Sequence, residues 1–165
     1  YQVPALMREI GQRVGMRYSS PNSSNANPNN VPNCLISMGY SCSSGLVNFE
    51  MASIRDALDE RRPVCIDGRD AANTRDGHTW IADGYEYSRI GTEFYEEKLI
   101  DNGLRLYYDY VLTSSTVQTT NLVHYNWGWN GDFNGLYAPV NGIYANGTTF
   151  NGLKMITSIR LAYVL

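Results

Sequence analysis

Apolar side chains near the start of the chain recur every three or four residues, which is the period of one face of a helix. This stripe consists of Val3, Leu6, Met7, Ile10 and Val14. Pro4 suits the first helical turn and Gly15 suits a helix end. We therefore expect a helix over residues 3–14. The run that follows, residues 19–30, is polar and rich in Ser, Asn and Pro, and it predicts a loop.

Two shorter helices are predicted before the pattern changes. The first covers residues 32–38 and ends at Gly39. The second covers residues 49–60, where apolar residues again share one face. Asn48 is its candidate N-cap, and Pro63 lies just beyond its end.

After Pro63 the pattern becomes that of strands, with alternating and β-branched or aromatic residues. Asn102 and Gly103 lie between two tyrosine-rich runs, which is a strong hairpin signal. Helices followed by a mostly antiparallel sheet indicate the α+β class. We expect one domain over residues 1–165, helical in 1–62 and sheet-forming in 63–165. The predicted strands are residues 64–66, 78–85, 92–100, 104–113, 122–127, 136–139 and 154–164.

Composition narrows the classes of function. The chain has 165 residues and a formal net charge of −3 with no basic stripe, which argues against nucleic-acid binding. No apolar run approaches the roughly 20 residues of a membrane span. Because the chain begins with Tyr1 and shows no signal peptide, we expect a processed piece of a longer precursor. Its three cysteines do not form a dense disulfide framework; Cys34 and Cys42 either pair or stay free.

His78 is the main candidate for chemistry. It follows a glycine and a polar loop, and it opens an apolar strand, so it is expected at the mouth of a strand. A histidine that acts as a general base needs a group that fixes its ring. Asn126 and Trp127 on a later strand suit this purpose, because an amide can orient the imidazole and an indole can shield it. The other interpretation is a structural histidine, and we interpret His124 in that way.

The position of Asn126 and Trp127 sets a condition on the backbone. Strand alternation places His124 and Asn126 on one face and Tyr125 and Trp127 on the other. If both residues serve one site, the backbone must distort there, and Gly128 would allow it. Two histidines without clustered carboxylates or cysteines give no metal pattern, so neither a metal nor a cofactor is expected.

Two stretches together resemble the streptopain family of papain-like cysteine peptidases (peptidase family C10). Residues 77–85 read Gly-His-Thr-Trp-Ile-Ala-Asp-Gly-Tyr, and residues 124–131 read His-Tyr-Asn-Trp-Gly-Trp-Asn-Gly. The family's pattern is Gly-His, an apolar strand, Asp-Gly, a return strand, then His-x-Asn-Trp-Gly-Trp and a glycine turn. The resemblance covers nearly the whole chain and is most specific in these two stretches.

The resemblance implies a papain-like fold, with a helical part and a β-sheet or half-barrel part. It also implies peptide-bond hydrolysis by a Cys–His dyad acting on a protein or peptide substrate. His78 matches the catalytic histidine, and Asn126 and Trp127 match the pair that supports and shields it. The family's cysteine lies far upstream of its histidine. Cys34, at an expected helix N-terminus that would lower its pKa, and Cys65, on a strand, do not fit that position.

We therefore expect the C-terminal part of a peptidase domain, with the nucleophile on an upstream segment or a partner chain of the same precursor. A secreted or cell-surface bacterial protein is expected, and the chain alone should be inactive. The alternative is a papain-like binding module that has lost catalysis. Two departures from the family stand out. Asp67 replaces a glutamine that lines the cleft in streptopain, and residues 86–121 form an insertion.

Overall fold

The structure is a computed structural model that describes residues 2–20, 23–139 and 142–162. Its contacts form two compact units. The main unit consists of Tyr1–Tyr85 with Leu122–Leu165, and the hairpin unit consists of Glu86–Asn121. The prediction of one domain with a helical part and a sheet part stays a prediction.

Three α-helices lie in the first part of the chain, as predicted. They are α1 (Gln2–Val14), α2 (Val31–Ser37) and α3 (Met51–Asp59), and a 3-10 turn, η1 (Pro28–Asn30), precedes α2. Gly15 ends α1 with a φ of 70°, in the left-handed region that glycine adopts without strain. The predicted cap of α3 is wrong by two residues. The cap position is Glu50, because Asn48 lies in a strand and its side chain accepts a hydrogen bond from Lys154.

The polar segment after α1 is more ordered than the predicted loop. Strand β1 (Arg17–Ser20) pairs antiparallel with β2 (Ser23–Asn25). Asn27 then caps η1, since its side chain accepts the backbone N–H of Asn29. The segment lacks apolar alternation, so the sequence pattern did not indicate these strands.

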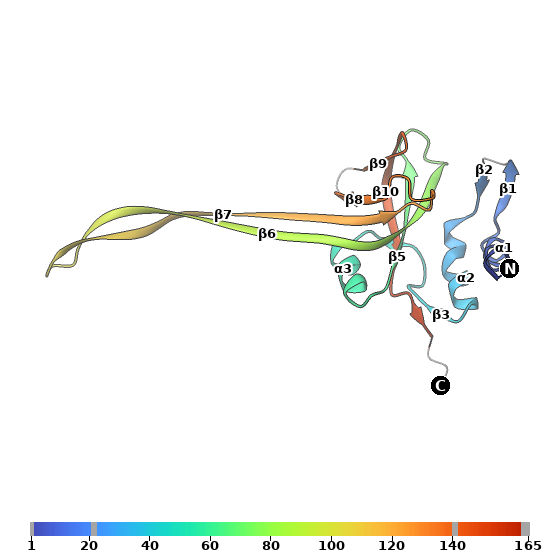
Figure 1. The fold of residues 1–165 in the computed structure, drawn as a ribbon, viewed down its shortest axis with the longest axis horizontal. Coiled ribbons are helices and arrows are strands. Elements are labelled where there is room, and N and C mark those ends of the chain that lie inside the picture. The colour runs from blue at the N-terminus through green and yellow to red at the C-terminus, as the bar shows by residue number, and fades with distance from the viewer. Residues whose placement is uncertain (1, 21–22, 140–141, 163–165) are drawn as a thin grey trace. The chain divides into compact units, whose positions relative to one another are not determined.

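A seven-stranded sheet is the centre of the fold (Figure 1). Its order is β4-β10-β5-β6-β7-β8, and β9 pairs with β10. Strand β10 pairs antiparallel with β4, β5 and β9, and the pairs β5–β6 and β7–β8 are also antiparallel. A further pair of strands, β3 (Tyr40–Ser41) and β11 (Arg160–Leu161), lies outside this sheet. The strands of the sheet are β4 (Val47–Asn48), β5 (Val64–Asp70), β6 (Gly77–Asp101), β7 (Leu106–Asn126), β8 (Gly135–Tyr137), β9 (Ile143–Ala145) and β10 (Thr148–Ile156).

The predicted strands exist, but several bounds differ. The runs predicted at residues 78–85 and 92–100 are one strand, β6, and those at 104–113 and 122–127 are one strand, β7. The last predicted strand, residues 154–164, is divided between β10 and β11. Ser158 lies between these strands with a φ of 59°, which interrupts extended backbone. Residues 163–164 of that prediction lie outside the described residues.

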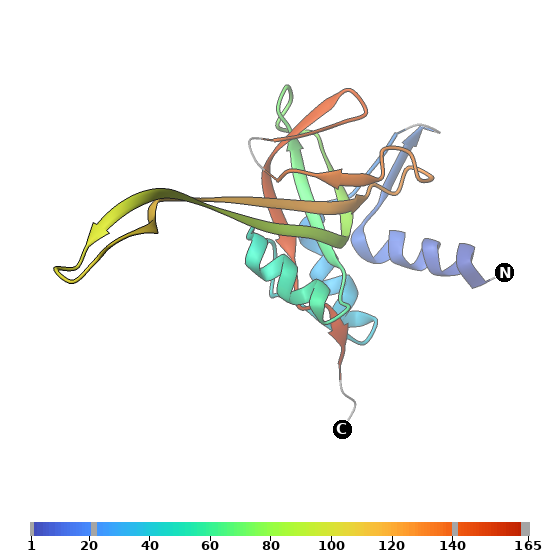
Figure 2. The same ribbon diagram turned by 60° about the vertical axis from the view of Figure 1, so that its left-hand side comes forward.

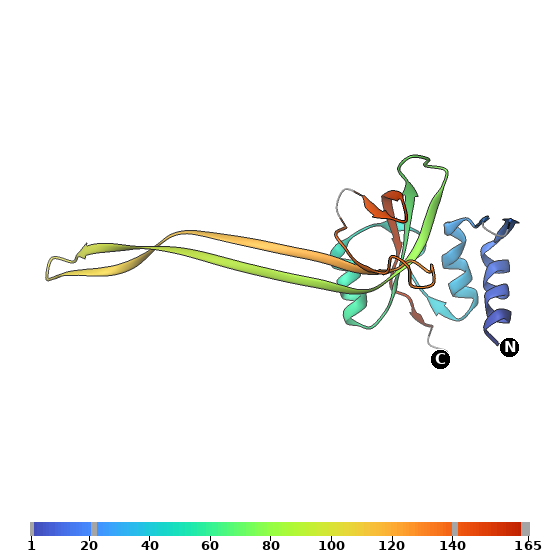
Figure 3. The same ribbon diagram turned by 45° about the horizontal axis from the view of Figure 1, so that its top comes forward.

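The core of the main unit forms between the sheet and α3. In Figures 1 and 3, α3 lies on one side of β5 and β10, and α1 and α2 lie on the other. Ile54 and Ala57 on the buried face of α3 pack with the sheet side chains. These buried residues are Val64, Ile66, Trp80, Ala82, Val123, Tyr125, Ile143, Ala145, Phe150 and Met155 in the strands, and Trp127 directly after β7. The α+β, papain-like prediction is confirmed, with an open sheet rather than a closed barrel.

The hairpin unit contains the adjoining parts of β6 and β7, which run side by side (Figure 2). The predicted turn is present: Gly103 has a φ of 79°, and the Asn102 side chain accepts the backbone N–H groups of Leu104 and Arg105. Thr113 on β7 donates its hydroxyl to the carbonyl oxygen of Phe94 on β6. Most side chains of this unit are exposed.

Candidate active site

His78 and Trp127 are brought together although 49 residues separate them. His78 is the second residue of β6, and Trp127 directly follows the neighbouring strand β7. The Nε2 atom of His78 lies 2.8 Å from the backbone carbonyl oxygen of Trp127. Since a carbonyl oxygen only accepts, Nε2 donates the proton in this bond. In the neutral ring Nδ1 is then the basic nitrogen, and it has no hydrogen-bond partner among the described residues.

Aromatic rings surround the imidazole of His78. The nearest is Trp129, whose ring centroid lies 4.6 Å away at an interplanar angle of 28°. Trp127 and Trp80 lie at 6.0 and 6.1 Å, both close to parallel with the imidazole, and Phe150 lies at 6.3 Å. Trp80 and Trp127 are almost completely buried. These rings fix the plane of the imidazole and limit the access of water to it.

This environment lowers the pKa of His78. Burial is the largest cause, because it disfavours the charged ring. The hydrogen bond to the Trp127 carbonyl and the nearby charge of Asp67 act in the opposite direction and are smaller. The neutral ring, which can accept a proton, is therefore favoured at neutral pH.

Asn126 occupies a different place from the one expected. Its side chain is exposed, and its Oδ1 accepts the backbone N–H of Gly128 at 3.1 Å. Among the described residues, no hydrogen bond joins Asn126 to His78. The expected alternation is present, with Tyr125 and Trp127 buried on the opposite face from Asn126. The backbone carbonyl of Trp127, rather than the amide of Asn126, holds the imidazole.

The turn after β7 contains site residues that sequence reasoning did not assign. Gly128 has a φ of 75°, so the chain changes direction directly after Trp127. Asn134 accepts the backbone N–H of Trp127 at 3.0 Å through its Oδ1 atom. Trp129 then stacks on His78. The repeated tryptophan of the Trp-Gly-Trp motif was the available signal for Trp129, whereas nothing in the sequence distinguished Asn134 from other turn asparagines.

A pocket of about 210 Å³ lies beside His78. The residues around it come from the end of β5, the loop before β6 and the start of β6, the turn after β7, and the β9–β10 hairpin. They include Asp70, Asp76, Gly77, Trp129 and Phe150. The half-buried His78 thus borders an open space that another group can enter.

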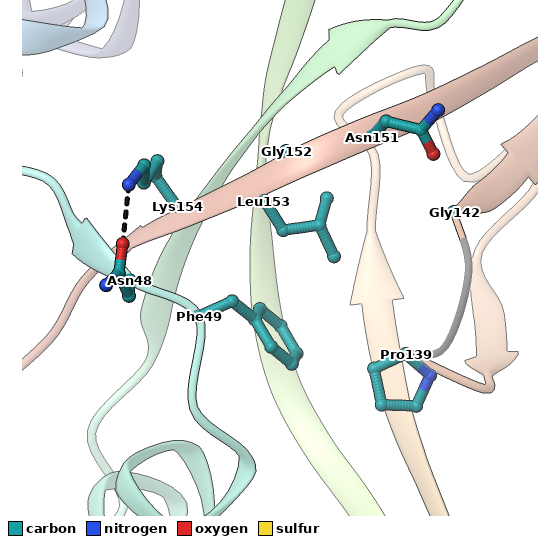
Figure 4. Close-up of a pocket in the computed structure, with 8 residues that line it drawn as sticks. All are labelled: Asn48, Phe49, Pro139, Gly142, Asn151, Gly152, Leu153 and Lys154. Carbon is teal, nitrogen blue, oxygen red and sulfur yellow. Dashed lines mark hydrogen bonds between the residues drawn. The ribbon is translucent and has the colours of Figure 1, made fainter.

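A larger hollow of about 760 Å³ lies elsewhere in the main unit (Figure 4). Phe49 and Leu153 point into it, while Lys154 extends to Asn48. The described residues that line it include no histidine, cysteine or carboxylate. Its lining therefore offers no general base, and the pocket at His78 is the better candidate for catalysis.

Comparison with known proteins assigns the family. The model of the Peptidase C10 family matches residues 1–137. The chain belongs to this family. Among solved structures, the chain is similar to interpain A, an active cysteine protease from Prevotella intermedia, with a TM-score of 0.56 and 19% identity. The similarity covers 98% of this chain but only 56% of interpain A. A search of curated proteins found no match.

The assignment to the C10 peptidases makes the state of the three cysteines important, because the family's chemistry requires a thiolate. All three are free thiols, so the possible pairing of Cys34 with Cys42 is not formed. Burial raises the pKa of each, and for Cys65, where the charge of Asp67 adds to burial, it reaches about 12. Burial raises the pKa of Cys34, the fourth residue of α2, so the expected lowering of its pKa is wrong.

The strand register also separates Cys65 from His78. In the β5–β6 pairing, Gly68 lies opposite His78, and Cys65 lies opposite Ile81. Directly opposed residues share a face, and successive residues alternate between faces. Cys65 and His78 therefore belong to opposite faces of the sheet. None of the three thiols has a lowered pKa, and Cys65 does not share a face of the sheet with His78.

Asp67 is the one buried charged residue of the described chain, with 4% of its surface exposed. It accepts the hydroxyl of Thr79 at 2.9 Å and pairs with the Arg69 guanidinium at 3.3 Å. Burial raises the pKa of Asp67, and these two partners and His78 reduce the rise. In turn, the charge of Asp67 raises the pKa of His78, because a nearby negative charge favours the protonated ring.

His124, interpreted as structural, pairs with Asp83 at the surface. No group of three or more potential metal ligands occurs among the described residues. No described helix is long and apolar enough to cross a membrane.

Proposed function

We propose that this chain is the histidine-bearing part of a secreted bacterial cysteine endopeptidase. The cysteine lies on an upstream segment or on a partner chain of the same precursor. One observation carries the proposal: the Trp127 carbonyl holds His78 at Nε2, its Nδ1 has no hydrogen-bond partner among the described residues, and His78 borders a pocket. Family membership and the bacterial solved relative support the class of enzyme.

The chemistry follows from the state of the imidazole. The free Nδ1 of His78 takes the proton of the cysteine thiol, and the thiolate attacks the peptide carbonyl carbon. The resulting imidazolium returns this proton to the leaving amine, and an acyl-enzyme thioester remains. The same nitrogen then takes a proton from water as the water oxygen attacks the thioester carbonyl carbon. The C–S bond breaks, the carboxylic acid product leaves, and the imidazolium returns the proton to the thiolate. The Trp127 carbonyl and the Asp67 carboxylate stabilise the charged ring in these steps.

Each assigned residue has a separate role in this proposal. Trp127 supplies the carbonyl that orients the imidazole, and Trp127 and Trp129 shield the ring from water. Asn126 acts through the turn, because its bond to Gly128 fixes the backbone that follows β7. Asn126 is thus a positioning residue for Trp127 and Trp129.

Two observations support a nucleophile outside this chain. The three thiols have raised pKa values. In addition, part of the apolar stripe of α1 remains exposed at Val3, Leu6 and Met7, with 70%, 47% and 61% of their surfaces accessible. An unpartnered stripe on an amphipathic helix suits packing against a further polypeptide segment.

The experiment compares the chain alone with the chain combined with the cysteine-bearing segment of its precursor. Both samples are titrated with a thiol-directed covalent protease inhibitor and assayed on a peptide substrate. We expect stoichiometric labelling and hydrolysis only in the combined sample. Labelling of Cys34 or Cys65 in the isolated chain would overturn the location of the nucleophile.

A papain-like binding module without catalysis is the second candidate, because the raised pKa values of all three thiols fit the absence of any nucleophile as well as a nucleophile on another segment. The same experiment separates the two. A precursor without a cysteine-bearing segment, or a combined sample that binds peptide without hydrolysing it, would support the binding module.

A further inference from the structure

The hairpin unit leaves one edge of each strand free. Strand β5 pairs with β6 at residues 77–82, and β8 pairs with β7 at residues 123–125. Across Glu86–Asn121, the described parts of β6 and β7 therefore pair only with each other. A free edge presents unpaired N–H and C=O groups that can accept another strand.

The same unit exposes much apolar surface. More than half of the exposed large apolar side chains among the described residues lie in it. They include Phe94, Tyr108, Tyr110, Leu112 and Val117, with between 49% and 69% of their surfaces accessible. Isolated two-stranded hairpins are marginally stable in water, and large apolar patches mark interaction sites. The hairpin unit is therefore suited to association.

The two free edges of the hairpin unit, one on β6 and one on β7, differ in charge. Within this unit, β6 is acidic, with Glu86, Arg89, Glu93, Glu96, Glu97, Lys98 and Asp101. By contrast, residues 110–121 of β7 contain no charged side chain and no proline or glycine, and they are rich in Thr, Ser and Val. Charges and prolines normally protect a free edge from pairing. The edge of β7 lacks this protection, whereas the edge of β6 has it.

We propose that two copies of this chain associate through antiparallel pairing of residues 110–121 of β7. A strand that pairs with its own copy about a two-fold axis must not oppose like charges, and this segment has none to oppose. Threonine pairs and the exposed Val111, Leu112 and Val117 would gain neighbours across the new contact. Pairing of β6 with its own copy would instead bring glutamates together.

The geometry also limits the assembly to two copies. A two-fold contact uses the same patch on both partners, so it closes. The paired hairpins form a four-stranded ribbon whose outer edges are the two acidic β6 strands. Repulsion between these edges opposes the addition of further copies.

The test is sedimentation velocity of the whole chain over a range of concentrations, with two matched variants. Thr116→Lys places a lysine from each copy in the proposed contact, while Thr92→Lys makes the same change at an exposed position of β6. We expect a reversible dimer whose Kd rises at least about tenfold in Thr116→Lys. We expect no more than about a twofold change in Thr92→Lys.

A second measurement does not depend on the lysine variant folding. In a Cys42→Ser background, Ser115→Cys should form an intermolecular disulfide on mild oxidation, and Ser88→Cys should not. The proposal is overturned if the chain is monomeric at all concentrations, or if both lysine variants change the Kd equally. Aggregates that keep growing, or a β7 edge that pairs only with a strand of another protein, would also overturn it.

Discussion

Three physical effects meet at the imidazole of His78, and their balance decides what the ring can do. Burial lowers its pKa, while the Trp127 carbonyl and the charge of Asp67 raise it. The sequence predicted that His78 and Trp127 would meet, because strand order follows from hairpin connections. It did not predict which atoms would touch. The choice of the Trp127 carbonyl over the Asn126 amide depends on the backbone turn at Gly128, which no periodic pattern encodes.

The first prediction concerns the titration of His78. Nuclear magnetic resonance of the ring nitrogens should show a proton on Nε2 and a pKa below the ordinary value of 6.5. Asp67→Asn should lower this pKa further, because it removes a negative charge that favours the imidazolium. A proton on Nδ1 in the neutral ring, or a rise in pKa in Asp67→Asn, would contradict this assignment.

At the scale of the elements, β5 and β6 pack closely because a glycine of β5, Gly68, leaves room for a tryptophan of β6, Trp80. Gly68 lies opposite His78, and a Cβ atom at Gly68 would meet the Trp80 ring at 2.7 Å and the Phe150 Cβ at 3.0 Å. Because Gly68 has no side chain, the Trp80 ring can pack directly against the backbone of β5 at this position. The sequence indicated β5 only over residues 64–66, because Gly68 and the charged residues beyond it do not follow a strand pattern. The prediction likewise divided β7, because its Ser- and Thr-rich residues 114–121 include few apolar side chains.

The second prediction follows from this contact. Gly68→Ala should reduce the free energy of unfolding by about 1–3 kcal/mol, because the added methyl group overpacks against the Trp80 ring and the Phe150 Cβ. Gly45→Ala is the matched control, since nothing lies within 4 Å of a Cβ atom there and its φ is not left-handed. Urea denaturation measures both. An equal effect of the two substitutions would show that Gly68 does not provide room for Trp80.

In the molecule as a whole, the buried site makes stability depend on pH. The folded state lowers the pKa of His78, so between that value and 6.5 the unfolded chain binds more protons than the native chain. The free energy of unfolding therefore rises with pH over this window. The contribution of His78 is complete above 6.5 and is lost as the pH falls through the folded pKa.

The third prediction uses His78→Gln to isolate this contribution. The stability of the wild type relative to His78→Gln should increase as the pH rises from about 5 to 7.5. Urea denaturation at several pH values measures the difference. A difference that stays constant, or that falls with increasing pH, would show that burial does not lower the pKa of His78.

The role of His78 as general base is tested most directly by peptide hydrolysis by the chain combined with its cysteine-bearing segment, with one histidine changed at a time. Removing a general base costs about 10²–10⁴-fold or more in rate. We predict this loss in kcat for His78→Gln and near wild-type activity for His124→Gln, because neither His124 nor its exposed partner Asp83 lines the pocket at His78. Wild-type activity in His78→Gln, or equal losses in both variants, would exclude His78 as the general base.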